Sequence, residues 1–266
     1  MPTGVNSLQL AAFSWLPPLD ALALAWFLIC MVGYGLVTRY TPIYRRSLMA
    51  GMQEQRRAWM REMAVREGRF QDIQLLGNLA NGHTFFASTS AIVVGGLSAM
   101  LGSGEKVQSY FEQLPFAAKS APVLWEIKVM LLMGLFVYAF FKFAWAFRLA
   151  HYTMVLIGAA PAYNAARPES ALAATDHADL AAHLAGVSAE HGHAGLRSYF
   201  YAVAGIAWFL SPIAFMVVST WVLVILIRRE FFSRSCRTIW AAKSAINLER
   251  RRDAQASVKL EAHEPR

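Results

Sequence analysis

Four apolar runs, each about as long as a membrane helix, decide what this chain can fold into. They cover residues 19–37, 83–101, 123–147 and 199–227. A helix of about 20 residues crosses the hydrocarbon core of a bilayer, which is about 30 Å thick. Backbone groups in lipid must be hydrogen-bonded within their own segment, and no run alternates as a barrel strand does. The sequence therefore predicts an all-α polytopic membrane helical bundle with about four transmembrane helices.

Composition and charge agree with a membrane protein. Of the 266 residues, 56% are hydrophobic and only 16% are charged, which is too apolar for a soluble monomer. The net charge is +8, but the basic residues flank the apolar runs. We therefore expect contact with anionic lipid head groups and no nucleic-acid partner. Cys30 and Cys236 lie far apart in the sequence and give no case for a disulfide, a metal or another cofactor.

The chain is predicted to be one membrane helical domain over 1–240, followed by a polar tail, 241–266, that we expect to be disordered. Between the first two runs, apolar residues at helical spacing form one stripe from Met52 to Ile73. Such an amphipathic helix either lies on the membrane surface or packs on a partner. A second amphipathic segment, basic in character, begins the sequence after Ile227.

If this chain has four spans, its Lys and Arg counts do not decide the orientation by the positive-inside rule. The first and third connections hold 11 Lys and Arg residues, whereas the N-terminus, the second connection and the tail hold 12. Because the first helix usually dominates, we place the first connection, with residues 45–69, in the cytoplasm. This puts the basic tail outside, so either one apolar run is not a simple span or the orientation is undecided.

Cations in and after the third apolar run raise a functional question. Lys128 and Lys142 enclose 13 uncharged residues, so each lysine is within reach of the interface by snorkelling. Arg148 and His151 share one face, and the apolar pattern continues to Pro161, which predicts a helix that runs on past the interface. These cations are either a helix end that reaches water or a cationic face turned into the bundle, where it would be functional.

Small and polar residues form a stripe along the second run, spaced alternately by three and four. This stripe is either a seam where helices pack closely or the wall of a water-filled pathway. With the cations of the third run it defines a candidate intramembrane polar site: Asn81, Thr84, Ser88, Lys142, Arg148 and His151.

Two further features of the sequence lead to expectations about structure. Pro212 lies inside the fourth run and predicts a kink, with Ser211 bonded to the freed carbonyl. The third connection is rich in Ala and His, and Asp179 and His183 stand one helical turn apart. A zinc site there lacks the H-E-x-x-H order and a cysteine, so we expect a solvated helix over residues 170–186 and no metal.

Four stretches of the sequence together resemble a known family. They are "NLANGHTFFASTSAIVVGGL", "KFAWAFRLAHYTMVLIGAAP", "LRSYFYAVAGIAWFLSP" and "VILIRREFFSR". Their order and spacing resemble the domain-of-unknown-function 599 family of bacterial and plant integral membrane proteins, over roughly residues 18 to 240. The resemblance implies about four membrane helices and no established activity. It also implies a multi-pass protein of the bacterial inner (plasma) membrane.

Three functional hypotheses follow from these features. The first is a non-enzymatic integral membrane protein that forms a homo-oligomer or joins a membrane-protein partner. The second is a channel or carrier for a small anionic solute, with a pathway lined by the second and third helices. The third, a lipid-active enzyme that uses the histidines, lacks a nucleophile–base pair and ranks last. Because no internal repeat of the kind common in transporters is present, the first hypothesis is favoured.

Overall fold

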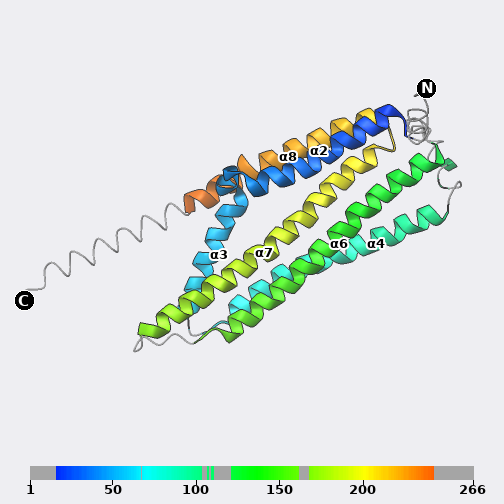
Figure 1. The fold of residues 1–266 in the computed structure, drawn as a ribbon. Coiled ribbons are helices and arrows are strands. Elements are labelled where there is room, and N and C mark those ends of the chain that lie inside the picture. Colours follow the sequence, from blue (N-terminus) through cyan, green and yellow to red (C-terminus); the bar gives the residue numbers. More distant parts are fainter. Residues whose placement is uncertain are drawn as a thin grey trace, which may run out of the picture.

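The computed structural model describes residues 16–66, 68–103, 107, 109–110, 121–161 and 168–242, and they form a bundle of helices (Figure 1). The elements are α2 (Pro18–Tyr40), the short 3-10 helix η1 (Pro42–Arg46), α3 (Leu48–Val65), α4 (Phe70–Gly102), α6 (Pro122–Ala159), α7 (Pro168–Ala207) and α8 (Pro212–Phe231). Residues 234–242 are also helical. Four helices, α2, α4, α6 and the one that starts at Pro212, are long and apolar enough to span a membrane. The predicted all-α membrane bundle is confirmed.

The fourth apolar run contains parts of two helices. α7 ends at Ala207, and the chain turns before α8 begins at Pro212. The Ser211 backbone is extended, as is typical of a residue before proline, and its Oγ accepts a hydrogen bond from the amide of Ala214. The expected kink at Pro212 is therefore wrong, because proline at the first position of a helix needs no hydrogen-bond acceptor.

The last part of α7 runs antiparallel to α2 along its length. The Trp208 indole donates to Asp20 Oδ1 at 2.7 Å near the start of α2, and Tyr201 Oη donates to the Cys30 carbonyl at 3.0 Å further along. In Figure 1, α7 lies between the α2–α8 pair and the α4–α6 pair. The chain thus travels along the bundle five times, through α2, α4, α6, α7 and α8.

The long helices extend beyond the α2–α8 pair at one end. The apolar part of α2, Pro18–Thr38, has 21 residues and matches the bilayer core, which takes about 20 residues. By contrast, α6 has 38 residues and α7 has 40, which at about 1.5 Å per residue is nearly twice the length that the core requires. The excess lies at the end where α2 meets η1 and α3 (Figure 1). We call this part of α4, α6 and α7, together with α3, the extension.

Two groups of buried apolar residues follow this division. The first, among α2, α6, α7 and α8, contains Phe27, Tyr201, Trp208 and Phe215. The second lies in the extension, where Met60 and Met63 of α3 pack against a row of α7 alanines: Ala174, Ala178, Ala181, Ala182 and Ala185. α7 is therefore a central packing helix. The expected helix over residues 170–186 is confirmed as part of α7, but it is solvated on one side only, because its small alanines allow α3 and α6 to approach closely on the other.

α3 is the predicted amphipathic helix, but it is shorter than expected. It ends at Val65, where Arg66 is extended, and α4 begins at Phe70. Phe70, a member of the predicted stripe, consequently belongs to α4 and is 74% exposed. The apolar face of α3 packs on α7 of the same chain. Of the predicted tail, residues 243–266 lie outside the described residues, and 241–242 are helical.

Candidate functional site

The polar stripe of α4 lies on the exposed side of this helix, although Ser98 Oγ at its far end is 3.7 Å from Met133 Sδ of α6. Asn81, Thr84 and Ser88 are exposed, and so are the stripe's remaining members Ala91, Gly95 and Ser98. The side of α4 that packs on α6 is a different one, with Leu76, Ala80, Ser90 and Leu97 buried. No described helix of the chain therefore covers the stripe.

The glycines of α4 and α7 have opposite environments. A Cβ on Gly192 or Gly195 of α7 would lie 2.4 Å from the His83 ring or 2.7 Å from the Phe143 ring. These glycines are required for close approach of α4 and α6. Around the glycines of α4, in contrast, a Cβ would meet no atom within 4 Å: Gly77, Gly82, Gly95, Gly96 and Gly102. Nothing within the described chain accounts for them.

The predicted continuation of the third span is confirmed, since α6 runs without a break to Ala159. Arg148 and His151 lie on its exposed side, together with Trp145 and Val155. His151 Nδ1 is 3.0 Å from the Phe147 carbonyl of its own helix. In a single chain this cationic face points outward.

Lys142 points toward α7. Its Nζ lies 3.5 Å from His191 Nδ1 and 5.2 Å from the centroid of the Tyr138 ring. The six predicted site residues thus occupy three places: the outer face of α4, the outer face of α6, and the contact of α6 with α7.

Three arginines that the sequence analysis does not single out come together where α3, α7 and α8 meet. They are Arg56 of α3, Arg197 of α7 and Arg229 of α8, and all three lie within electrostatic range of the His193 imidazole. Burial, followed by the charges of these arginines, lowers the pKa of His193 to about 4, so the ring is neutral at pH 7. We call these three residues the arginine cluster.

Neighbouring aromatic rings support two members of the arginine cluster. The guanidinium carbon of Arg197 lies 5.9 Å from the centroid of the Tyr34 ring, and that of Arg229 lies 5.9 Å from the centroid of Phe200. A guanidinium that faces a ring keeps its N–H donors available at its edge. Arg56 is more enclosed: its Nη1 is buried without a hydrogen-bond partner, and burial lowers its pKa.

The two acidic residues beside the arginine cluster hold other donors. Glu190 Oε1 accepts from the Tyr44 hydroxyl at 3.1 Å, and Glu230 Oε1 accepts from the Met49 amide at 3.2 Å. Burial, and then the charge of Glu190, raise the pKa of Tyr44 to about 12, so this hydroxyl remains a donor. Among the described residues, none of the three arginines is within ion-pair distance of a carboxylate.

A second polar group lies inside the membrane-spanning part. Lys128 is only 2% exposed, and its Nζ lies 5.6 Å from the centroid of the Trp208 ring. Asp20, which accepts the Trp208 indole hydrogen bond, is within electrostatic range of the lysine. The expected snorkelling of Lys128 is wrong, because a carboxylate and an aromatic face inside the bundle replace the water it would otherwise seek.

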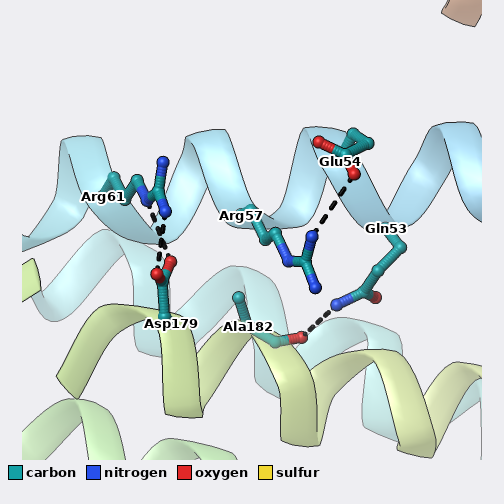
Figure 2. A network of polar contacts seen from close by, with 6 residues as sticks. All are labelled: Gln53, Glu54, Arg57, Arg61, Asp179 and Ala182. Carbon is teal, nitrogen blue, oxygen red and sulfur yellow. Dashed lines mark hydrogen bonds and ion pairs between the residues drawn. The ribbon is translucent and has the colours of Figure 1, made fainter. Parts of the chain in front are cut away.

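Polar contacts fix α3 against α7, as Figure 2 shows. Both nitrogens of the Arg61 fork bind Asp179, Nε to Oδ1 at 2.9 Å and Nη2 to Oδ2 at 2.8 Å. The hydrogen bond from Arg61 holds the pKa of Asp179 below its usual range. About two turns earlier in α3, Gln53 donates to the Ala182 carbonyl at 2.9 Å. Asp179, considered above as a zinc ligand, is thus occupied by an arginine.

Arg69 joins α4 to the end of α6. Its guanidinium donates to the carbonyls of Ala160 and Pro161, the latter at 2.7 Å, where α6 has exposed its last backbone acceptors. The extension is therefore held by specific polar contacts at both α3 and α6. Among the described residues, no group of three or more His, Cys, Asp or Glu is placed to hold a metal ion.

A family model described as "Protein of unknown function, DUF599" matches residues 22–235. The chain belongs to the DUF599 family. No curated protein matches the chain, and no solved structure does. Membership confirms the resemblance found in the sequence, and the match runs from within α2 to the end of α8 in this DUF599 chain. Since the family description names no activity, the function must be inferred from the surfaces described above.

The arginine cluster was missed because its members are far apart in the sequence. Arg197 and Arg229 stand at the two ends of the fourth apolar run. When this run is read as one span, its ends lie on opposite sides of the membrane. In this DUF599 chain the run is a hairpin, so both arginines lie at the same level of the bundle. Reading Ser211–Pro212 as a turn would have predicted the hairpin, and with it the proximity of Arg197 and Arg229.

Proposed function

We propose that this chain is a non-enzymatic integral membrane protein that assembles with copies of itself, the α4 stripe of one copy packing against that of another. The observation that carries this proposal is the number of α4 glycines with empty surroundings: α4 has five, whereas α2 and α6 have two each. Each glycine in a helix interior costs about 1 kcal/mol relative to alanine. In α7 the glycines are explained by contacts within the chain; in α4 they are not. A second helix that approaches closely would explain them.

The chemistry of the stripe fits contact with an identical stripe. It carries no charge, and its hydroxyl and amide side chains, on Asn81, Thr84 and Ser88, can both donate and accept hydrogen bonds. Such groups are self-complementary across a two-fold axis. Small residues at helical spacing also let the backbones of two membrane helices approach closely, with no large side chain between them.

The orientation that we propose places the extension in the cytoplasm. With five passages along the bundle, the first connection, the third connection and the tail lie on one side and hold 21 Lys and Arg residues, whereas the other side holds two. This imbalance is strong by the positive-inside rule. It replaces the near-equal counts obtained when the fourth apolar run is treated as one span.

Replacement of Gly95 by Leu tests the self-association. Gly95 is exposed and its neighbourhood is empty, so Gly95→Leu should leave the monomer folded while the bulky side chain separates the two copies. We expect the oligomer seen by size-exclusion chromatography with light scattering to shift toward monomer. Gly134→Leu is the control, because Gly134 is an exposed glycine of α6 with equally empty surroundings. An oligomer that is unchanged in Gly95→Leu would refute the proposal.

A channel for a small anion is the second candidate. The outward-facing hydroxyls of the α4 stripe and the outward-facing Arg148 favour it, because an assembly of several copies would turn such faces toward a common axis. Chloride flux into liposomes that carry the wild-type protein, and its loss in Arg148→Gln, would support the channel. Absence of flux from liposomes with verified oligomers would exclude it.

A further inference from the structure

The arginine cluster has an excess of positive charge that the chain does not satisfy. Arg56, Arg197 and Arg229 form no hydrogen bond or ion pair among the described residues, and the two nearby carboxylates hold Tyr44 and Met49 instead. The Arg56 Nη1 atom is buried and unpaired. Glu190 is near enough to act on Arg56 by its charge but accepts no hydrogen bond from it, and a buried N–H donor without an acceptor is unfavourable, so an external anion that accepts from this atom would stabilise the fold.

The arginine cluster lies at the boundary of the membrane. Arg229 stands two residues after the apolar stretch of α8, whose last members are Ile225, Leu226 and Ile227. Tyr34, which faces Arg197, stands near the end of the apolar part of α2, Pro18–Thr38. This level is where lipid phosphate groups lie. Arg56 reaches the same place from the extension.

We propose that Arg56, Arg197 and Arg229 form a binding site for a phosphate group, the chemistry that an anionic lipid head group shares with free inorganic phosphate. Three guanidinium groups approach from three helices, which suits an anion with several acceptor oxygens better than a carboxylate with two. The neutral His193, whose ring is within electrostatic range of all three, adds a ring nitrogen without adding charge. Because α3, α7 and α8 each supply one arginine, a bound phosphate would link the extension to the membrane-spanning part.

The site is independent of the proposed self-association, since every group that forms it belongs to one chain and lies away from the α4 stripe. A protein that stays monomeric would still bind phosphate here, and an oligomer would still form if the site were empty. The two proposals can therefore fail separately.

Binding is tested with the full-length purified protein and two probes. One probe is inorganic phosphate, titrated against protein in neutral detergent. The other is phosphatidylglycerol, measured as lipid retained per chain by native mass spectrometry after reconstitution in a phosphatidylcholine background. The variants are Arg56→Gln and Arg229→Gln. Their controls are the adjacent residues, Arg57→Gln and Arg228→Gln; Arg57 pairs with Glu54, and both control arginines are exposed.

We expect wild type to bind at least one probe and each cluster variant to bind it about tenfold more weakly, whereas the controls bind as wild type. Selective retention of phosphatidylglycerol identifies the lipid as the source, and binding of inorganic phosphate alone identifies a soluble ligand. Because Arg229 is exposed, Arg229→Gln should fold normally, and Arg56→Gln without ligand should melt no lower than wild type. The proposal is overturned if wild type binds neither probe, if the cluster variants bind like wild type, or if all four variants weaken equally.

Discussion

Lys128 and Lys142 belong to the same apolar part of α6, yet the fold treats their charges differently. Lys128 is buried beside Asp20 and the Trp208 ring, whereas Lys142 is partly exposed and reaches His191. Burial decides how much each charge matters. Removing a buried cation leaves the neighbouring carboxylate unpaired in a medium of low polarity. When a partly exposed cation is removed, water or a head group can replace its contacts.

We predict that Lys128→Met destabilises the protein by about 3 kcal/mol, because the carboxylate of Asp20 keeps only the indole hydrogen bond. Lys142→Met, the same change in the same helix, should cost less than about 1 kcal/mol. Unfolding by a denaturing detergent, followed by tryptophan fluorescence, measures both. Equal costs for the two variants would contradict the assignment of Lys128 to a buried charge pair.

At this scale the sequence could show which residues are unusual, but not which way they point. The spacing from Lys128 to Lys142 allows both to snorkel, and only the antiparallel contact of α2 with the end of α7 reveals that Asp20 lies near Lys128. Arg148 and His151 were correctly placed on one face of a continuing helix. Whether that face points into or out of the bundle depends on where α4 and α7 pack against α6. The periodicity of the sequence carries no information about this packing.

Among the elements, α7 carries most of the packing that joins the others. Its alanines accept α3, its glycines accept side chains of α4 and α6, and its C-terminal part follows α2. Gly195 tests this role against a buried ring: a Cβ there would lie 2.7 Å from the ring of Phe143, which is 0% exposed and stacked on Phe86. The ring has no free space into which to move.

We predict that Gly195→Ala lowers stability by about 1–3 kcal/mol through this overlap. Gly134→Ala, at an exposed glycine of α6, should instead raise stability by about 0.5–1 kcal/mol, since alanine is the better helix former. Melting temperatures of the two variants in detergent distinguish them. A stabilising Gly195→Ala would show that α7 and α6 are further apart than the structure has them.

Element boundaries were the least predictable part of the fold. The stripe from Met52 to Ile73 keeps its helical period across a break, because Phe70 and Ile73 resume the same phase after the chain bends at Arg66. Hydrophobicity likewise runs unbroken through the turn at Ser211. In both places the deciding signal is local. Arg66 is extended and pairs with Asp72, while Arg69 donates to a carbonyl of α6; at the other break, a capping serine stands before a proline.

On the scale of the whole molecule, the proposed orientation with five passages puts the extension and the tail on the same side of the membrane. The prediction is tested in a protein whose Cys30 and Cys236, both buried, are replaced by serine. Single cysteines are then introduced as Arg57→Cys in α3, Arg237→Cys after α8 and Lys119→Cys between α4 and α6. An impermeant maleimide applied to intact cells should label only position 119. Labelling of position 237 from outside would restore the four-span arrangement.

The uncharged turn between α7 and α8 also matters while the chain is being made. The C-terminal part of α7 leaves the ribosome before α8 does, but from Arg197 to the turn it is shorter than the about 20 residues that a helix needs to enter a bilayer by itself. α8 has the length and the hydrophobicity to enter. The end of α7 should therefore wait at the translocation machinery until α8 emerges. The two segments then insert together as a hairpin, and no charge has to be carried across at its tip.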